Sequence, residues 1–351
     1  FKQKTAYEIP LRLVGSEMCI RDSLYIGVLN QLVYFELISL LKQLYYLHHL
    51  PCFLMRMKYI SNYVTYLLLI FIGCSGINES TDEETEILSC SGILIEIDTS
   101  RGDCSITLNH NNEVTISISS PNRIITSNNI PNHDVGIFGN VSGAINPNSI
   151  SPQNGNYSIS LNPIKNLESI PLEDNGPNYS FGILLNGVEI DPIAAEPWPH
   201  TGRPGNFPDN VNWDWNLEAS MVDIGLDCNN AHVQPTGKYH YHGIPKLYLE
   251  TLVTNENEML LVGYAADGFP IYYRYGYSDP EDINSKIIDL KTSYRLKSGD
   301  RPGDGETAPC GEYSGVYTND YEFENNLGDL DSCNGRTGIT PEYPDGTYYY
   351  I

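Results

Sequence analysis

The chain has 351 residues, enough for one large domain or two ordinary ones with a substantial buried core. Twenty lysines and arginines stand against 44 acidic residues, so the formal net charge at pH 7 is -24. A surface this acidic repels nucleic acid and anionic lipid headgroups, and we expect neither to bind it.

The first part of the chain does not have the pattern of a folded domain. The stretch PLRLVGSEMCIRDS resembles translated adapter sequence from nucleic-acid libraries, so residues 1–23 are left out of the fold prediction. Residues 24–56 are dense in Leu and Tyr without glycine-bounded elements, and we interpret them as upstream sequence. A membrane helix is the alternative, which the charges of Glu36 and Lys42 disfavour.

Residues 57–73 have the pattern of an export signal. Arg56 and Lys58 supply positive charge, and the apolar run that follows is too short to span a bilayer. The end of this run resembles a bacterial lipobox, which implies that Cys74 is lipidated and that only its acyl chains hold the mature protein to a membrane. An uncleaved anchor is the alternative. Residues 74–87 are polar and acidic and predict a flexible tether.

Residues 88–351 predict a mainly β domain, an antiparallel sheet or sandwich with one or two short helices. Segments rich in β-branched and aromatic residues alternate with Gly, Asn and Pro, which is typical of short strands. The strand-rich segments are 92–97, 104–108, 113–119, 122–127, 181–190 and 259–273. The best helical segments are 216–221 and 245–253, the second with Pro at its first position.

Five cysteines lie in this β domain, and an exported domain meets an oxidising compartment, so we expect disulfides. Metal-binding thiolates are the alternative, which the absence of C-x-x-C spacing disfavours. Cys90 and Cys104 flank a hairpin-sized segment, and Cys228 and Cys333 lie in two similar motifs. We therefore predict these two pairs, with Cys310 left over.

The stretch GKYHYHGIP alternates tyrosine and histidine between glycine and proline breakers. In an extended strand, His240 and His242 point to one face and the two tyrosines to the other. The preceding HVQPTG predicts a hairpin, in which the loop length decides the face of His232. A four-residue loop would send His232 to the tyrosine face. We predict a five-residue loop, Gln234 to Lys238, or a longer one of the same parity, since it brings all three imidazoles together.

Three neutral imidazoles with an open position suit Zn²⁺ or Cu²⁺ and could activate a bound water. Tyr239 and Tyr241 would pack behind the site as support, together with Asp227. His133 and Asp267 are additional candidates, although an isolated histidine is usually hydrogen-bonded in a core or at a surface and Asp267 lies in a glycine turn. The alternative for the whole motif is an aromatic strand with solvent-facing histidines.

The segment at 330–351, LDSCNGRTGITPEYPDGTYYYI, is similar to LDCNNAHVQPTGKYHYH at 226–242. Both run from an acidic cysteine turn into an aromatic strand, so they could form pseudo-symmetric strands of one sheet. Tyr349 and Ile351 stand where the first copy has its strand histidines. Only the first copy could therefore bind a metal.

Several stretches together resemble the YHYH-domain family, over most of residues 110–351. They are NIPNHDVGIFG, FGILLNGVEIDP, LDCNNAHVQPTGKYHYHGIP, GYAADGFPIYY and LDSCNGRTGITPEYPDGTYYY. The resemblance implies an extracytoplasmic domain of the bacterial cell envelope, and it implies no particular reaction. Members of the family continue into a tail with another cysteine, so it also implies that this chain is a fragment and that Cys310 pairs with the tail.

Three functions remain open. The first is a metal-binding envelope protein, which leaves open whether it is an enzyme and which residues are catalytic. The second is a surface domain that binds or acts on glycans through carboxylates and Trp198, Trp213 and Trp215. The third is a structural adhesion module with a protein partner. The common nucleophile and nucleotide-binding motifs are absent, so their chemistries have no support.

Overall fold

The structure, a computed structural model, describes residue 90 and residues 95–167, 169, 172, 180–202, 206–253 and 258–351. The predicted adapter-like sequence, export signal, lipidated Cys74 and tether lie outside these residues. Within the described part, no helix has the length and apolar character needed to cross a membrane.

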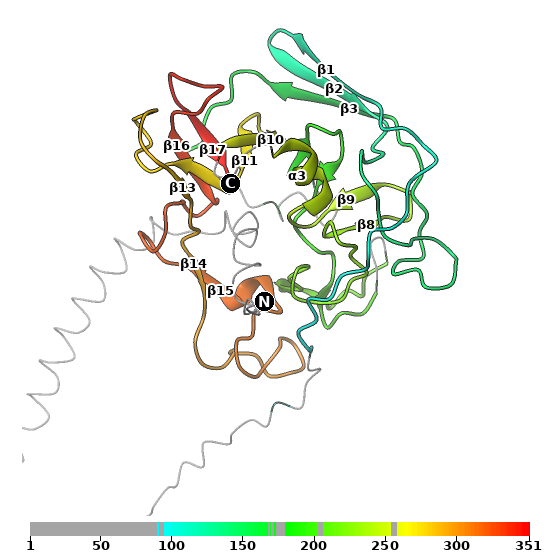
Figure 1. Cartoon of the computed structure of the whole chain (residues 1–351). Helices are drawn as coiled ribbons and strands as arrows, with labels where there is room; N and C mark the ends of the chain where they lie inside the picture. The colour runs from blue at the N-terminus through cyan, green and yellow to red at the C-terminus, as the bar shows by residue number, and fades with distance from the viewer. Residues whose placement is uncertain are drawn as a thin grey trace, which may run out of the picture. The chain divides into compact units, whose positions relative to one another are not determined.

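The described residues form a mainly β domain, as predicted. Its largest element is an eight-stranded sheet (Figure 1). In spatial order its strands are β16 (Gly335–Gly338), β17 (Thr347–Tyr350), β11 (Pro270–Tyr273), β10 (Leu260–Ala265), β4 (Gly182–Leu184), β5 (Glu189–Ile190), β9 (Tyr239–Tyr241) and β8 (Ala231–Val233).

A three-stranded antiparallel sheet and three strand pairs accompany the large sheet. The three-stranded sheet contains β1 (Val114–Ser119), β2 (Asn122–Ser127) and β3 (Gly155–Ser160). The pairs are β6 (Pro197–Trp198) with β7 (Asn212–Asn216), β12 (Tyr275–Tyr277) with β13 (Ile287–Asp289), and β14 (Tyr294–Leu296) with β15 (Tyr321–Phe323). The helical elements among the described residues are α3 (Lys246–Leu252) and the 3₁₀ turn η5 (Thr318–Asp320).

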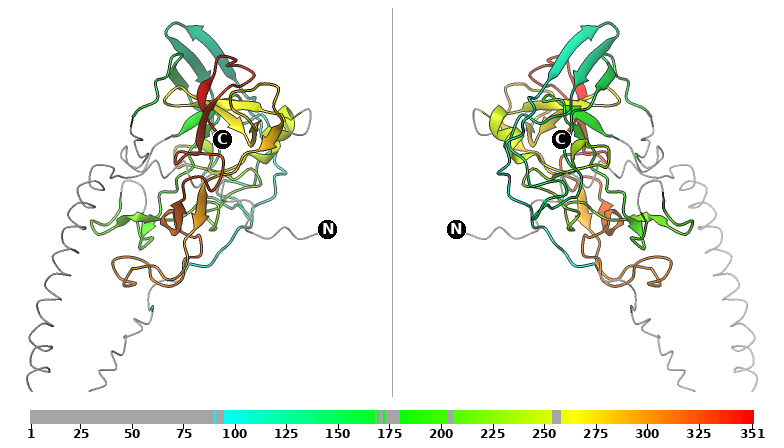
Figure 2. Two further views of the ribbon diagram at one scale, coloured as in Figure 1. Left: turned by 90° about the vertical axis from the view of Figure 1, so that its left-hand side faces the viewer. Right: turned by 90° about the vertical axis from the view of Figure 1, so that its right-hand side faces the viewer.

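The three-stranded sheet packs against the middle of the large sheet through a small apolar cluster. Ile125 of β2 and Ile159 of β3 contact Ile183 of β4 and Tyr264 of β10, and all four side chains are buried. Figure 2 shows the three strands as a cyan-to-green ribbon in both views. This contact places β4 and β10 in the interior of the domain, where their short apolar runs are buried.

Three sequence expectations about secondary structure are wrong. In the segment 92–97, the described residues 95–97 form no strand, and residues 104–108 contribute only an isolated bridge from Ile106 to Val135. The segment 216–221 is not helical, because its first residue is the end of β7, in which tryptophan and polar residues alternate. Leu217 is buried at the end of this alternation and bridges to Tyr317, and a turn follows.

The eight-stranded sheet is built from two equivalent halves. β4 and β10 pair antiparallel at its centre, and each is followed outward by its hairpin partner, a parallel strand and an outer antiparallel strand. The parallel contacts also correspond, because Ile190 pairs with Tyr241 in one half and Ile271 with Tyr350 in the other. The two similar sequence motifs therefore form pseudo-symmetric strands of one sheet, as the sequence suggested.

In the first half, the carboxylate of Asp227 closes the turn that leads into β8. Its Oδ1 accepts the N–H groups of Asn229 and Ala231, at 2.9 and 3.3 Å, and its Oδ2 accepts the N–H of Gly136 at 3.0 Å. The hydroxyl of Tyr239 in β9 donates to the same Oδ2 at 2.8 Å. One fully buried carboxylate therefore joins the turn, the neighbouring chain segment and the tyrosine strand.

In the second half, Asp331 has the same role at the turn into β16. Its Oδ1 accepts the N–H groups of Cys333 and Gly335, both at 3.0 Å, and the hydroxyl of Tyr348 in β17 at 3.0 Å. The side chain of Asp331 is 36% exposed, however, and it also pairs with Lys165. The two halves thus share a hydrogen-bond pattern but bury it to different extents.

Disulfides between described residues join Cys104 to Cys228 and Cys90 to Cys310. The predicted pairs Cys90–Cys104 and Cys228–Cys333 are therefore wrong, and so is the assignment of Cys310 to a further tail. The internal symmetry explains the second error. Cys228 precedes β8 and Cys333 precedes β16, and these strands lie at opposite edges of the eight-stranded sheet. The two cysteines, although they have equivalent positions in the two motifs, therefore lie at opposite edges of the sheet and do not pair with each other.

We expect non-reducing proteolysis with mass spectrometry to recover peptides that link Cys104 to Cys228. Replacing both cysteines by serine should lower the free energy of unfolding by about 2–5 kcal/mol, because the bond closes a long loop in the unfolded chain. Denaturant titration measures this loss. A peptide that links Cys90 to Cys104 would contradict the assignment.

Replacing Tyr239 by Phe should destabilise the domain by about 1–3 kcal/mol, because it removes a hydrogen bond from a fully buried carboxylate. Tyr348→Phe is the matched control in the other half. It should cost less, since water can replace the lost hydroxyl at the partly exposed Asp331. Equal losses in urea denaturation would show that burial of the aspartate does not set the cost.

Candidate metal centre

The β8–β9 hairpin has the predicted five-residue loop, Gln234 to Lys238. His232 is directly opposite His240, so the parity that places the imidazoles on one face is confirmed. The N–H of Gln234 donates to the carbonyl of Lys238 at 2.9 Å. Gly237 has a φ of 89°, and a Cβ at this position would collide with the side chain of Ser151. Glycine is thus needed both for the turn and for its packing.

The three histidines of the hairpin meet through their Nε2 atoms. The Nε2 of His242 is 3.0 Å from that of His240 and 3.1 Å from that of His232. One ring nitrogen from each residue lies within 4.8 Å of the other two, so the group could hold a metal ion. Tetrahedral coordination with bonds of 2.0–2.1 Å places ligand nitrogens about 3.3–3.4 Å apart. Small movements of the histidine side chains would therefore bring the observed nitrogen spacing to that of a tetrahedral metal site.

Backbone carbonyls lie beside all three imidazole rings. The carbonyl of Ile224 is 2.8 Å from Nδ1 of His232, and the carbonyl of Lys238 is 3.5 Å from Nδ1 of His240. Pro192 offers a carbonyl to His242, although Nδ1 of His242 makes no full hydrogen bond among the described residues. A carbonyl favours a proton on Nδ1, which leaves the lone pair on Nε2. The surroundings therefore favour a lone pair on Nε2 for His232 and His240, and both lone pairs point toward Nε2 of His242.

Burial keeps these imidazoles uncharged. His240 and His242 are buried and His232 is half-buried. Burial lowers the pKa of all three below the ordinary 6.5, and the neighbouring imidazoles lower the pKa of His240 and His242 further. The neutral imidazole is the form that binds metals, so the group is ready for coordination at pH 7.

A polar layer that the sequence analysis missed lies on the imidazole face. β5 runs parallel to β9 with Glu189 beside His240, and residues in register share a face. Glu189 pairs with Lys238 at 2.6 Å. Asp191 continues the alternation, and burial raises the pKa of its carboxyl to about 8. The signal was the alternating Glu-Ile-Asp of residues 189–191, but nothing in the sequence indicated its parallel pairing with β9.

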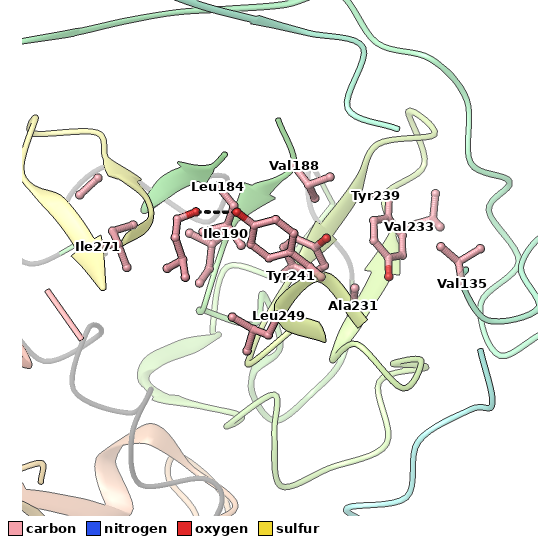
Figure 3. Close-up of a cluster of buried hydrophobic side chains, with 13 residues drawn as sticks. Val135, Leu184, Val188, Ile190, Ala231, Val233, Tyr239, Tyr241, Leu249 and Ile271 are labelled. Atoms are coloured by element: carbon pink, nitrogen blue, oxygen red, sulfur yellow. Dashed lines mark hydrogen bonds between the residues drawn. The ribbon is translucent and has the colours of Figure 1, made fainter. Parts of the chain in front are cut away.

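The tyrosines of the motif occupy the opposite face, as predicted. Tyr239 and Tyr241 are fully buried among the aliphatic side chains of the main apolar cluster (Figure 3). The hydroxyl of Tyr241 lies 2.7 Å from Nε2 of His133 and accepts a hydrogen bond from the side-chain amide of Asn186 at 2.9 Å. His133 therefore belongs to the tyrosine side. Asp227 supports this side as well, through Tyr239.

Asp267 also lies apart from the three histidines. Its Oδ1 accepts the N–H of Phe269 at 3.1 Å, within the turn that joins β10 to β11. Its Oδ2 accepts the hydroxyl of Tyr350 at 2.5 Å. In the other half, Asn186 has the equivalent place and bonds Tyr241. Both contacts fix a hairpin turn to a tyrosine of the neighbouring parallel strand, which is a structural role.

Comparison with known proteins gives one match. The sequence pattern of a family described as "YHYH protein" matches residues 156–351, which include both halves of the large sheet and all three histidines of the site. No curated protein matches the chain, and no solved structure does. The family match extends over more than half of the chain, and the chain therefore belongs to the YHYH protein family.

Proposed function

We propose that the protein binds a divalent transition metal ion, zinc or copper, through the Nε2 atoms of His232, His240 and His242. The observation that carries this proposal is the convergence of three neutral imidazoles, two of which, His232 and His240, have a backbone carbonyl beside Nδ1. Without a cation, the lone pairs of such nitrogens repel one another. A bound cation satisfies all three at once.

The ligand set also indicates the kind of centre. Imidazole nitrogens suit zinc and copper, and no carboxylate or thiolate of the described residues joins the three histidines. Three neutral ligands leave the charge of the ion uncompensated and one tetrahedral position open, so the bound ion would act as a Lewis acid.

We place this centre outside the cytoplasm. The disulfides Cys104–Cys228 and Cys90–Cys310 are consistent with an oxidising compartment. Anchoring of the protein to a bacterial envelope membrane through a lipidated Cys74 stays a prediction from the sequence. A protein or glycan partner at the cell surface stays a prediction as well.

The buried tryptophans disfavour the glycan alternative. Trp198 and Trp215 pack with Tyr317 and Val316 in an apolar cluster, and less than a tenth of either indole is exposed. Trp213 is half-buried and packs edge-on against Phe207. Side chains held in this way do not present a flat face on which a sugar ring could stack.

Tag-free protein should contain about one equivalent of zinc or copper by elemental analysis. His240→Ala and His242→Ala should each lower metal affinity by roughly tenfold or more, because each removes one of three ligands. His110→Ala is the matched control, since His110 is exposed and lies outside the group. Metal contents that stay the same in the ligand variants and in the control would refute the proposal.

Metal retention should extend to pH values below 6.5, the ordinary pKa of histidine. Protons compete with the metal only when they can charge the imidazoles, and burial makes that charging harder in this site. Dialysis against buffers of decreasing pH, followed by elemental analysis, measures the release. A release midpoint at or above pH 6.5 would show that the imidazoles titrate like exposed ones.

A further inference from the structure

We propose that the second half of the sheet holds a small oxyanion, a carboxylate or a phosphate, between Arg336 and Tyr349. Arg336 in β16 is directly opposite Tyr349 in β17, so the two side chains share a face. In the first half, His232 is directly opposite His240 at the corresponding positions. The oxyanion site would therefore be the symmetric counterpart of the metal centre.

Polar atoms at both positions are buried without a hydrogen-bond partner. Tyr349 is fully buried, and its hydroxyl has no partner among the described residues. The same holds for Nη1 of Arg336, whose Nη2 makes only a long contact of 3.4 Å with the carbonyl of Ser278. Buried donors are almost always paired in folded proteins, because leaving one unpaired destabilises the fold. Two such atoms in one cross-strand pair indicate a missing acceptor.

The chemistry of the pair selects the ligand class. A guanidinium and a phenol both donate hydrogen bonds, and the positive charge of Arg336 repels cations. Asp329 is an acidic side chain that influences Tyr349, and its Oδ2 already accepts the backbone N–H of Lys291 at 2.8 Å. The site therefore needs an external acceptor, and a carboxylate or phosphate can accept from both donors at once.

The packing around the pair limits the size of this ligand. The ring of Tyr349 lies in a buried apolar cluster with Met259, Tyr272 and Leu290. Gly276 is also close, because a Cβ placed there would lie 3.4 Å from the hydroxyl of Tyr349. Because this hydroxyl is enclosed by packed side chains, we expect a small group rather than an extended chain.

Calorimetric titration with sodium acetate and with inorganic phosphate tests the site, with sodium chloride at equal ionic strength as the reference. The protein is first treated with a chelator, so that the result does not depend on the metal centre. We expect saturable binding of at least one of the two anions. Tyr349→Phe should weaken it by roughly tenfold, and Arg336→Gln should abolish it. Arg295→Gln is the charge-matched control at an exposed arginine, and it should bind like the wild type.

Binding of neither anion beyond the chloride reference would overturn the proposal, and so would unchanged binding by the Tyr349 and Arg336 variants. Thermal unfolding gives an independent readout that keeps the test valid if a variant binds nothing. Without anion, Tyr349→Phe should be at least as stable as the wild type, because it removes an unpaired buried hydroxyl. With saturating anion, the wild type should become the more stable protein. A loss of stability in Tyr349→Phe without anion would mean that the hydroxyl has a partner within the protein.

Discussion

The four hydrogen bonds to the carboxylate of Asp227 fix the part of the structure on which the histidine site depends. They join the turn before β8, the chain near Gly136 and the hydroxyl of Tyr239 in one buried place. Burial raises the pKa of this carboxyl, and the donated hydrogen bonds lower it. The neighbouring disulfide between Cys104 and Cys228 holds the same turn from the other side. Because both ends of the β8–β9 hairpin are fixed in this way, its register has little freedom to slip.

The register of the β8–β9 hairpin determines which side chains share a face. Side chains alternate along β9 with a period of two, so one face holds imidazoles and the other phenols. The phenol face is satisfied within the protein by Asp227, Asn186, His133 and the apolar cluster around them. On the imidazole face, Nε2 of His242 lies beside the Nε2 atoms of His240 and His232. The hairpin thus completes its core on one side and presents on the other a group that could hold a metal ion.

The features that the sequence predicted correctly, the fold class and the hairpin, depend on local sequence rules. The fold class followed from short β-branched and aromatic segments between breakers. The meeting of His232 with His240 followed from a five-residue loop, which was preferred over a four-residue loop because it brings the three imidazoles together. Prediction failed for contacts between segments that are far apart in the sequence. The disulfide partners depend on the two-fold arrangement of the sheet, which sends Cys228 and Cys333 to opposite edges. The parallel pairing of Glu189 with His240 is equally non-local, and no pattern within either segment signals it.

The two halves show how one scaffold can carry different chemistry. Each has an aspartate in the turn, a tyrosine bonded to it and a parallel strand anchored to a hairpin turn, through Asn186 in one half and Asp267 in the other. We call these groups the frame, because they hold the strands of each half together. The positions that face away from the tyrosine core differ, with His232 and His240 in one half and Arg336 and Tyr349 in the other. These positions and the frame residues alternate along the same strands, so the two faces of each hairpin can differ without a change in the frame.

The short loop from Gln234 to Lys238 therefore limits how this protein can change over time. Substitutions within the loop alter only its stability, provided that Gly237 keeps its left-handed conformation. A single inserted or deleted residue is different, because it shifts one strand of the hairpin by one position and turns every side chain of that strand to the opposite face. His232 would then lie among the buried tyrosines. Relatives that keep the three histidines together should consequently differ in loop length by even numbers of residues, even where the loop sequences have nothing in common.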